Sequence, residues 1–196
     1  MFKLQGEYDL ALKSHKKCLA IEEAVYANAA HPSIAGSYQS FGLLHKSQKH
    51  YEQALEYCEK SLAMYQAVYD DIDHSSIANS YNSIGSAYKS LEKFDQTLEN
   101  YKKCLTMYQA VYGDVDHPDI ATCYENIGGA NEALGHYLEA KEYYERCLDI
   151  RIAVCSSPNH LYTEETRRLL DGIKQHSLSC TNTLALFVVS TEDFDT

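Results

Sequence analysis

Nine histidines are the side chains in this sequence that could act in acid–base catalysis or bind a metal near neutral pH. Four of them recur every 43 residues, at His31, His74, His117 and His160. One histidine in each repeated segment would be spread along the molecule, whereas catalysis needs groups that converge on one substrate. We therefore expect these histidines to cap or pack helices, and we predict no catalytic residue.

The acidic residues come close to one metal-binding pattern. Asp114, Asp116 and Glu125 fit three ligand positions of a calcium-binding loop. Pro118 and Asp119, however, stand where that loop needs a further ligand and an obligatory glycine. The sequence contains no nucleophile elbow, zinc-protease motif or phosphate-binding loop. It therefore predicts no metal site, no cofactor and no enzymatic activity.

Three of the seven cysteines, Cys18, Cys104 and Cys147, occupy one equivalent place in the repeated segments, and Ser61 fills that place in the remaining copy. A position shared by cysteine and serine favours a small buried side chain. An odd number of cysteines without a Cys-x-x-Cys pair indicates neither a disulfide framework nor a zinc site. We expect these thiols to serve packing.

Net charge limits the partners of the chain. Its 196 residues carry 28 acidic and 17 basic side chains, for a formal charge of −11. Nucleic acids and anionic membranes both attract clustered Lys and Arg, and the sequence has no such run. No segment reaches the roughly 20 apolar residues that cross a bilayer, and the N-terminus lacks the apolar core of a signal peptide. We expect no nucleic-acid partner, no membrane partner and a cytoplasmic location.

The 43-residue spacing also relates the glycines Gly42, Gly85 and Gly128, and the aromatic residues Tyr26, Tyr69 and Tyr112. A fixed period between about 20 and 50 residues is typical of proteins in which each repeated unit packs on its neighbours. The sequence therefore predicts a repeat array in place of a single closed domain.

Each period contains two helical patterns in succession. In the middle copy, apolar residues at helical spacing run from Ile77 to Leu91 and again from Phe94 to Tyr112. Residues 91–93 between them suffice only for a tight reversal, so each unit is predicted to be an antiparallel helical hairpin. We call its first helix helix A and its second helix B. The repeated glycines lie in the middle of helix A, where we expect the two helices to approach closely.

The residue order of the middle copy resembles the tetratricopeptide repeat pattern of large, Leu-Gly, Tyr, aromatic, aromatic and small side chains. The residues that carry this resemblance are Tyr81, Ile84, Gly85, Tyr88, Phe94, Tyr101 and Cys104. The long period, with HPDIA opening helix A and AVYGD closing helix B, is similar to the kinesin light chain and nephrocystin branch of that family. The resemblance covers approximately residues 2–176. It implies an all-α fold, a right-handed α-solenoid of antiparallel helical hairpins that forms a tetratricopeptide repeat superhelix.

Two kinds of position depart from the family pattern. Gly135 is the expected glycine in the reversal between helix A and helix B, but Lys49 and Glu92 occupy the equivalent places. His45 and Asn131 replace the aromatic residue of the middle copy. We expect looser local packing at these positions and no change of fold.

The period predicts how the chain is organised. A partial repeat, mainly a helix B at about 8–26, is expected at 1–30. Three full repeats follow at 31–73, 74–116 and 117–159. A capping segment is expected at 160–176 and a tail at 177–196. The capping segment resembles a helix A with a polar outer face, as the end of a repeat array requires, and we expect little regular structure in the tail. Because the first helix B has no helix A before it, we also expect the chain to be a piece of a longer array.

The resemblance further implies a function, because helix A lines the concave groove in which tetratricopeptide repeats bind peptides. We predict a non-catalytic scaffold or adaptor that binds a peptide segment of a partner protein in this groove. The predicted groove residues are Gln39, Lys46, Asn79, Asn82, Ser83, Ser86, Lys89, Glu125 and Asn126. Their amides and hydroxyls can donate and accept hydrogen bonds, as the backbone of a bound peptide requires.

The charges expected in the groove bear on the kind of peptide. Lys46, Lys89 and Arg168 are its only basic candidates, against Glu125 and Glu132. Tetratricopeptide repeats that grip a C-terminal carboxylate use several Lys or Arg residues for that purpose. We therefore expect no carboxylate clamp.

Two alternatives stay open at the level of sequence. Amides and hydroxyls on an outward helix face are also what an ordinary solvated helix carries. The chain could instead be a structural segment that forms a homo-oligomer, because its unpaired N-terminal helix must cover an apolar face. Such an oligomer should weaken when Leu12 and Leu19 become polar. By resemblance to the kinesin light chain and nephrocystin branch, association with the cytoskeleton or the cilium is a further expectation.

Overall fold

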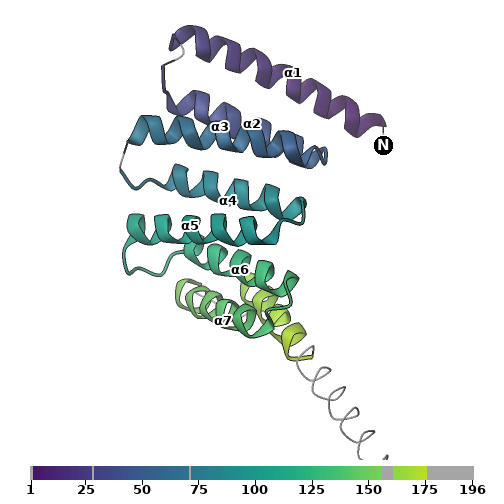
Figure 1. The fold of residues 1–196 in the computed structure, drawn as a ribbon, viewed down its shortest axis with the longest axis vertical. Helices are drawn as coiled ribbons and strands as arrows, with labels where there is room; N and C mark the ends of the chain where they lie inside the picture. Colours follow the sequence, from purple (N-terminus) through teal and green to yellow (C-terminus); the bar gives the residue numbers. More distant parts are fainter. Residues whose placement is uncertain (1, 28, 71, 156–160, 176–196) are drawn as a thin grey trace, which may run out of the picture. The chain divides into compact units, whose positions relative to one another are not determined.

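The structure, a computed structural model, describes residues 2–27, 29–70, 72–155 and 161–175. It divides into two compact units, Met1–Val115 and Asp116–Thr196, which we describe separately. Every regular element in the described ranges is an α-helix, and none of the described residues lies in a strand (Figure 1). The predicted all-α fold is thus confirmed. The tail expected at 177–196 and the fourth repeated histidine, His160, lie outside the described residues.

The first unit contains five helices: α1 (Phe2–Val25), α2 (Pro32–Ser47), α3 (Tyr51–Tyr69), α4 (Ser75–Ser90) and α5 (Phe94–Tyr112). Helix α2 packs on α3 and α4 packs on α5, so each pair forms an antiparallel hairpin of helix A and helix B (Figure 1). Helix α3 also packs on α4, and α1 packs on α2. The reversal predicted at 91–93 is confirmed by the bounds of α4 and α5.

The second unit contains α6 (Pro118–Ala133), α7 (Tyr137–Val154) and a helix at 161–175. Helices α6 and α7 form the hairpin of this unit. The helix at 161–175 buries one face, at the spacing of an amphipathic helix. That face consists of Thr163, Thr166, Leu170 and Ile173. Its apolar end packs with Ala140 and Tyr144 of α7, and this cluster is the core of the unit.

The repeated histidines begin the A helices. In His31, His74 and His117 the imidazole Nδ1 accepts a hydrogen bond from the backbone N–H two residues further on, at 3.1, 3.1 and 3.2 Å. Each occupies the N-cap position, where a side-chain acceptor satisfies one of the helix's free N–H groups. The expected capping role is confirmed for these three residues.

The same histidines hold the connection between consecutive hairpins. His31 stacks on Tyr26 with ring centroids 3.4 Å apart, and His74 stacks on Tyr69 at 3.6 Å. Tyr69 is the last residue of α3 and Tyr26 directly follows α1, and each histidine is the N-cap of the following helix A. A repeated aromatic pair therefore joins successive repeats of the first unit.

The hairpin reversals need a left-handed backbone. Lys49, Glu92 and Gly135 all have positive φ, of 63°, 57° and 78°. An L-residue with a side chain pays roughly 1–2 kcal/mol in this region, whereas glycine does not. The equivalence of Lys49 and Glu92 to a turn glycine is therefore confirmed, and both positions are strained.

The repeated glycines allow helix A to lie against helix B. A methyl group added to Gly85 would come within 2.7 Å of the Tyr101 ring of α5. The corresponding pairs are Gly128 with Tyr144 at 2.7 Å, and Gly42 with the Cys58 thiol at 2.6 Å. The close approach expected from the sequence is confirmed, because no larger residue fits without displacing its partner.

Small polar residues and thiols fill the space between the helices. Cys104, Cys147 and Ser61 are completely buried, as the shared repeat position predicted. Cys18, which occupies the same position in α1, is exposed, so the prediction is wrong there. The described residues place no helix A against that face of α1, and the thiol therefore faces solvent.

Helix α1 also begins earlier than predicted. We expected helix B to start at about residue 8, after a reversal, but α1 is continuous from Phe2 to Val25. Extending a helix that has already formed gains one hydrogen bond for each residue added, so the helix extends through residues 2–7.

Candidate functional site

The predicted groove residues fall on three A helices. Gln39 and Lys46 lie on α2, and Glu125 and Asn126 lie on α6. The remaining five, all on α4, are Asn79, Asn82, Ser83, Ser86 and Lys89. The first unit therefore carries seven of the nine, and the second unit carries two.

Four of these residues line one pocket of the first unit, between α2, α3 and α4. Lys46, Asn82, Ser83 and Ser86 surround a volume of about 160 Å³, together with Leu43. The floor of the pocket is made by Gly42, Ala54, Cys58 and Ala87. We call it the groove pocket. It brings an amide, two hydroxyls and an ammonium group to one small surface.

Lys46 is the charged member of the groove pocket. Its Nζ donates a hydrogen bond to the Ser86 hydroxyl, so an α2 side chain is held against α4. Leu43, one turn before Lys46, is 56% exposed although it is apolar. The pocket therefore has an accessible apolar rim beside a fixed positive charge.

Other predicted groove residues form hydrogen bonds within the hairpin or lie outside the groove pocket. Asn79 accepts a hydrogen bond from the Tyr108 hydroxyl of α5 at 2.8 Å, which ties helix A to helix B. Ser83 donates its hydroxyl proton to the Asn79 carbonyl at 3.0 Å. Gln39 is half-buried and Lys89 is exposed, and neither lines the groove pocket. The surface around the pocket is thus part of the hairpin's own hydrogen-bond network.

In the second unit, Glu125 is held by a residue that the sequence did not single out. Its carboxylate accepts two hydrogen bonds from Arg151 of α7, at 2.6 and 3.3 Å. Arg151 is buried to about nine-tenths, so the pair is well screened from water. The guanidinium also donates to the Tyr162 carbonyl at 2.9 Å and to the Thr166 hydroxyl. One side chain therefore connects all three helices of the unit.

Repeat spacing was the available signal for Arg151. Tyr65, Tyr108 and Arg151 follow one another at intervals of 43 residues, and Arg151 is the only charged residue of the three. Glu125 likewise follows Gln39 and Asn82 at that spacing. The two charged residues thus appear together in one repeat, and a position-by-position comparison would have found the pair. Asn126, the neighbouring predicted residue, is half-buried on α6.

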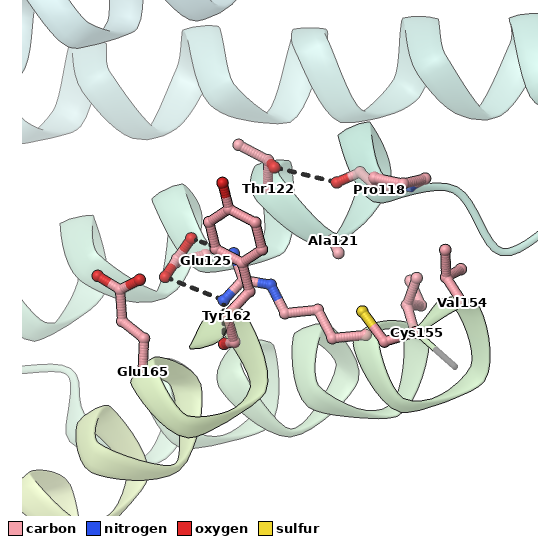
Figure 2. A pocket seen from close by; sticks show the side chains of 10 residues that line it. Pro118, Ala121, Thr122, Glu125, Val154, Cys155, Tyr162 and Glu165 are labelled. Atoms are coloured by element: carbon pink, nitrogen blue, oxygen red, sulfur yellow. Dashed lines mark hydrogen bonds and ion pairs between the residues drawn. The ribbon is translucent and has the colours of Figure 1, made fainter. Parts of the chain in front are cut away.

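Beside this ion pair lies a cavity of the second unit, with a volume of about 460 Å³. Its lining comes from α6, the end of α7 and the helix at 161–175. Figure 2 shows Glu125, Tyr162 and Glu165 on one side of this cavity, and Val154 and Cys155 on the other. The sequence did not predict this cavity, because three separate helices create it. We call it the Arg151 cavity.

Two buried thiols, those of Cys58 and Cys147, are unreactive at neutral pH. Burial raises the pKa of Cys58 and of Cys147 to about 11, so both are protonated at neutral pH. A protonated thiol is a poor nucleophile and a poor metal ligand. Within the described part of the chain, no three His, Cys, Asp or Glu side chains are grouped so that they could hold a metal ion.

Comparison with known proteins gives a family. The family model described as "Tetratricopeptide repeat" matches residues 1–67 and 76–153. No curated protein sequence matches the chain. Among the described helices, none combines the length and apolar character needed to span a membrane.

Two solved structures resemble nearly the whole chain. BtubC (BKLC) from P. vanneervenii has a TM-score of 0.72 and 19% identity, over 99% of this chain and 78% of its own. A Podosopora anserina protein assigned as a kinesin light chain, with nearly identical TPR-like repeats, also has a TM-score of 0.72 and 19% identity, over 98% of this chain and 92% of its own. At these identities the likeness concerns the fold.

A third structure contains a bound peptide. The first TPR of Spaghetti (RPAP3), bound to the HSP90 peptide SRMEEVD, has a TM-score of 0.56 and 20% identity. The match covers 76% of this chain and 98% of that one. A fold of this kind is thus able to hold a short peptide in that protein.

Proposed function

Because the chain belongs to the tetratricopeptide repeat family, whose repeats generally mediate protein–protein interaction, we propose that it is a non-catalytic scaffold that binds a peptide segment of a partner. The observation that carries this proposal is the groove pocket, where Lys46, Asn82, Ser83 and Ser86 meet. The peptide lies along α2 and α4 and places one side chain at this pocket.

The chemistry of the groove pocket suits an extended peptide. An asparagine amide offers a donor and an acceptor in one plane, which matches the N–H and C=O groups of a peptide backbone. Leu43 supplies an exposed apolar contact at the rim. Such a pocket can bind the backbone and one apolar side chain of a peptide. Its volume is too small for a large organic cofactor.

The fold gives independent support. The first TPR of Spaghetti holds the HSP90 peptide SRMEEVD in a fold similar to this one. Peptide binding needs no converging acid, base and nucleophile, and we assign no catalytic role to any residue of this chain. We place the protein in the cytoplasm, where a partner segment would be available to it.

The test is a selection from a randomised twelve-residue peptide library on the full chain. We expect enrichment of a motif that the Asn82→Ala, Ser86→Ala double variant loses. Thr106→Ala is the matched control, because Thr106 is exposed on α5 and takes no part in the groove pocket. If the double variant selects the same peptides as the unchanged chain, the groove pocket is not the binding site.

A second function is favoured by one observation on α1. Leu10, Ile21 and Val25 are 67%, 63% and 68% exposed, and they lie on one side of this helix together with the exposed Cys18. We propose self-association through this face as the alternative role. Leu12 and Leu19, named from the sequence, are half-buried and contribute less to it.

Mass measurement over a range of concentrations tests the alternative. We expect a dimer that dissociates in the Ile21→Glu, Val25→Glu variant and persists in Lys13→Glu, which changes an exposed polar position of the same helix. A monomer at every concentration would rule the alternative out.

A further inference from the structure

The Arg151 cavity of the second unit differs in size and charge from the groove pocket. Its volume of about 460 Å³ lies within the range of natural ligand sites, roughly 300–1,000 Å³. Its lining combines aliphatic and aromatic residues with the charged side chains of Glu125, Arg151 and Glu165. The cavity is therefore mainly apolar and carries three charged side chains.

The positive charge in the cavity is already matched. Both terminal nitrogens of Arg151 donate to the Glu125 carboxylate, and one of them also donates to Tyr162 and Thr166. An acidic ligand would have to displace Glu125 from a buried, bidentate ion pair, which costs several kcal/mol when it leaves a charge unpaired. The Arg151 guanidinium is therefore not available to bind an anionic ligand in this cavity.

The negative charge is in excess. Glu165 lies within electrostatic range of Arg151, but it forms no hydrogen bond or ion pair with any described residue. Two carboxylates, those of Glu125 and Glu165, thus face the one guanidinium of Arg151, and these three side chains together carry one net negative charge. In Figure 2 the Glu165 carboxylate lies on the same side of the cavity as Glu125. A cation entering the cavity gains a carboxylate that forms no hydrogen bond or ion pair with a described residue.

The apolar part of the lining fits the stem of such a cation. Ala121, Ile150 and Val154 supply aliphatic surface, and the exposed Tyr162 supplies an aromatic ring. Lysine and arginine bury their methylene stems along apolar surface while the charged end stays near water or a carboxylate. The volume exceeds that of one such stem, which leaves room for an adjacent apolar side chain.

We propose that the Arg151 cavity binds a Lys or Arg side chain, together with a neighbouring apolar side chain, of a partner protein. This inference rests on the proposed function and names the chemistry of its ligand. The formal charge of −11 acts in the same direction, because it attracts basic segments at long range. The partner segment is therefore basic and apolar, and an acidic segment is rejected.

Two small probes test the cavity alone. N-acetyl-Leu-Lys-methylamide and N-acetyl-Leu-Glu-methylamide are titrated into the full chain, with binding followed by ligand-observed NMR. We expect the lysine probe to bind up to about fivefold more tightly, since one partly exposed ion pair is worth up to about 1 kcal/mol. Glu165→Arg should remove this preference. Glu164→Arg is the matched control, because Glu164 is the exposed neighbour that does not line the cavity.

The outcomes separate this inference from the proposed function. Equal binding of the two probes, binding of neither, or a lysine preference that survives Glu165→Arg would each overturn the inference. The Asn82→Ala, Ser86→Ala variant should leave probe binding unchanged, because its substitutions lie in the first unit. Loss of the library motif in that variant speaks only for the groove pocket, so either proposal can fail while the other stands.

Discussion

The Arg151 guanidinium and the Glu125 carboxylate form a bidentate ion pair, with Nη2 2.6 Å from Oε2. At the same two repeat positions the middle copy carries Tyr108 and Asn82. The charged pair thus replaces an uncharged combination, and it additionally connects α6 and α7 to the helix at 161–175 through Tyr162.

Removing this arginine should destabilise the second unit. Arg151→Ala leaves the Glu125 carboxylate without its partner and frees the Thr166 hydroxyl, so we expect a loss of about 2–3 kcal/mol in the free energy of unfolding. Urea denaturation followed by circular dichroism measures it. Arg168→Ala, at an exposed position of the last helix, is the control and should change stability by less than about 0.5 kcal/mol.

The combination Arg151→Tyr, Glu125→Asn imitates the middle repeat. It removes Arg151 and its partner carboxylate together, so Glu125 is not left as a buried unpaired charge, and we expect it to recover most of the loss caused by Arg151→Ala. A double variant that is no more stable than Arg151→Ala would contradict the view that the unpaired carboxylate causes the loss.

Gly85 should not tolerate even one methyl group. Gly85→Ala places a carbon 2.7 Å from the Tyr101 ring, and we expect about 1–3 kcal/mol of destabilisation from overpacking. Gly172 is the matched control, since it lies in a helix with no atom within 4 Å of an added methyl group. Gly172→Ala should raise stability by up to about 1 kcal/mol through helix propensity. The two substitutions are chemically identical, so opposite signs can come only from packing.

Relief of backbone strain should stabilise the first unit. Glu92 has a φ of 57°, and Glu92→Gly removes the clash of its Cβ, with an expected gain of about 0.5–1 kcal/mol. Glu92→Ala keeps the Cβ and should give no such gain. Thermal denaturation of the two variants side by side is sufficient, and a gain from alanine equal to that from glycine would show that charge, not φ, matters.

His45 should make the first unit sensitive to mild acid. Burial lowers the pKa of His45, and His50 and Lys16 lower it further, against an opposing effect of Glu56. Because the folded pKa is below the unfolded value of about 6.5, the unfolded chain binds the proton first. The contribution of neutral His45 to stability is therefore complete above about pH 6.5 and is lost as the pH falls through the lowered folded value.

Comparison of two asparagine variants isolates this effect. His45→Asn introduces the residue found at the equivalent Asn131, where the amide donates to the Ile127 carbonyl. We expect it to lose less stability than the unchanged chain when the pH is lowered from about 7.5 to 5.5. His136→Asn, at an exposed position without a side-chain cap, is the control and should follow the unchanged chain. Parallel pH profiles for all three proteins would refute the assignment to His45.

The sequence was sufficient for the hairpins because their determinants are local and repeated. The turn at 91–93, the mid-helix Gly85 and the capping role of His74 each follow from a residue type at a fixed place in the period. The burial of a side chain, by contrast, depends on whether another helix packs over it, and the repeat pattern does not state this. Cys18 has the same identity as Cys104 but is exposed, since none of the described residues forms a helix A over its face of α1.

The candidate sites show the same division. Periodicity placed Lys46 and Ser86 on A helices, but their contact depends on the distance between α2 and α4, which no pattern in the sequence states. Arg151 belongs to a helix B, and the sequence pattern, which placed the groove on A helices, did not single it out. Its role became visible only when α6, α7 and the helix at 161–175 were placed around it.

The fit of each glycine to the ring or thiol opposite it determines where this chain can be cut and rejoined. Gly85 is fitted to Tyr101 and Gly128 to Tyr144, whereas Gly42 is fitted to a thiol, and both members of every pair lie in one hairpin. An engineered chain lengthened or shortened between α3 and α4 keeps each pair intact. A junction between α2 and α3 that joined α2 to a foreign helix B would exchange these partners, so the hairpin is the natural module for building arrays of other lengths.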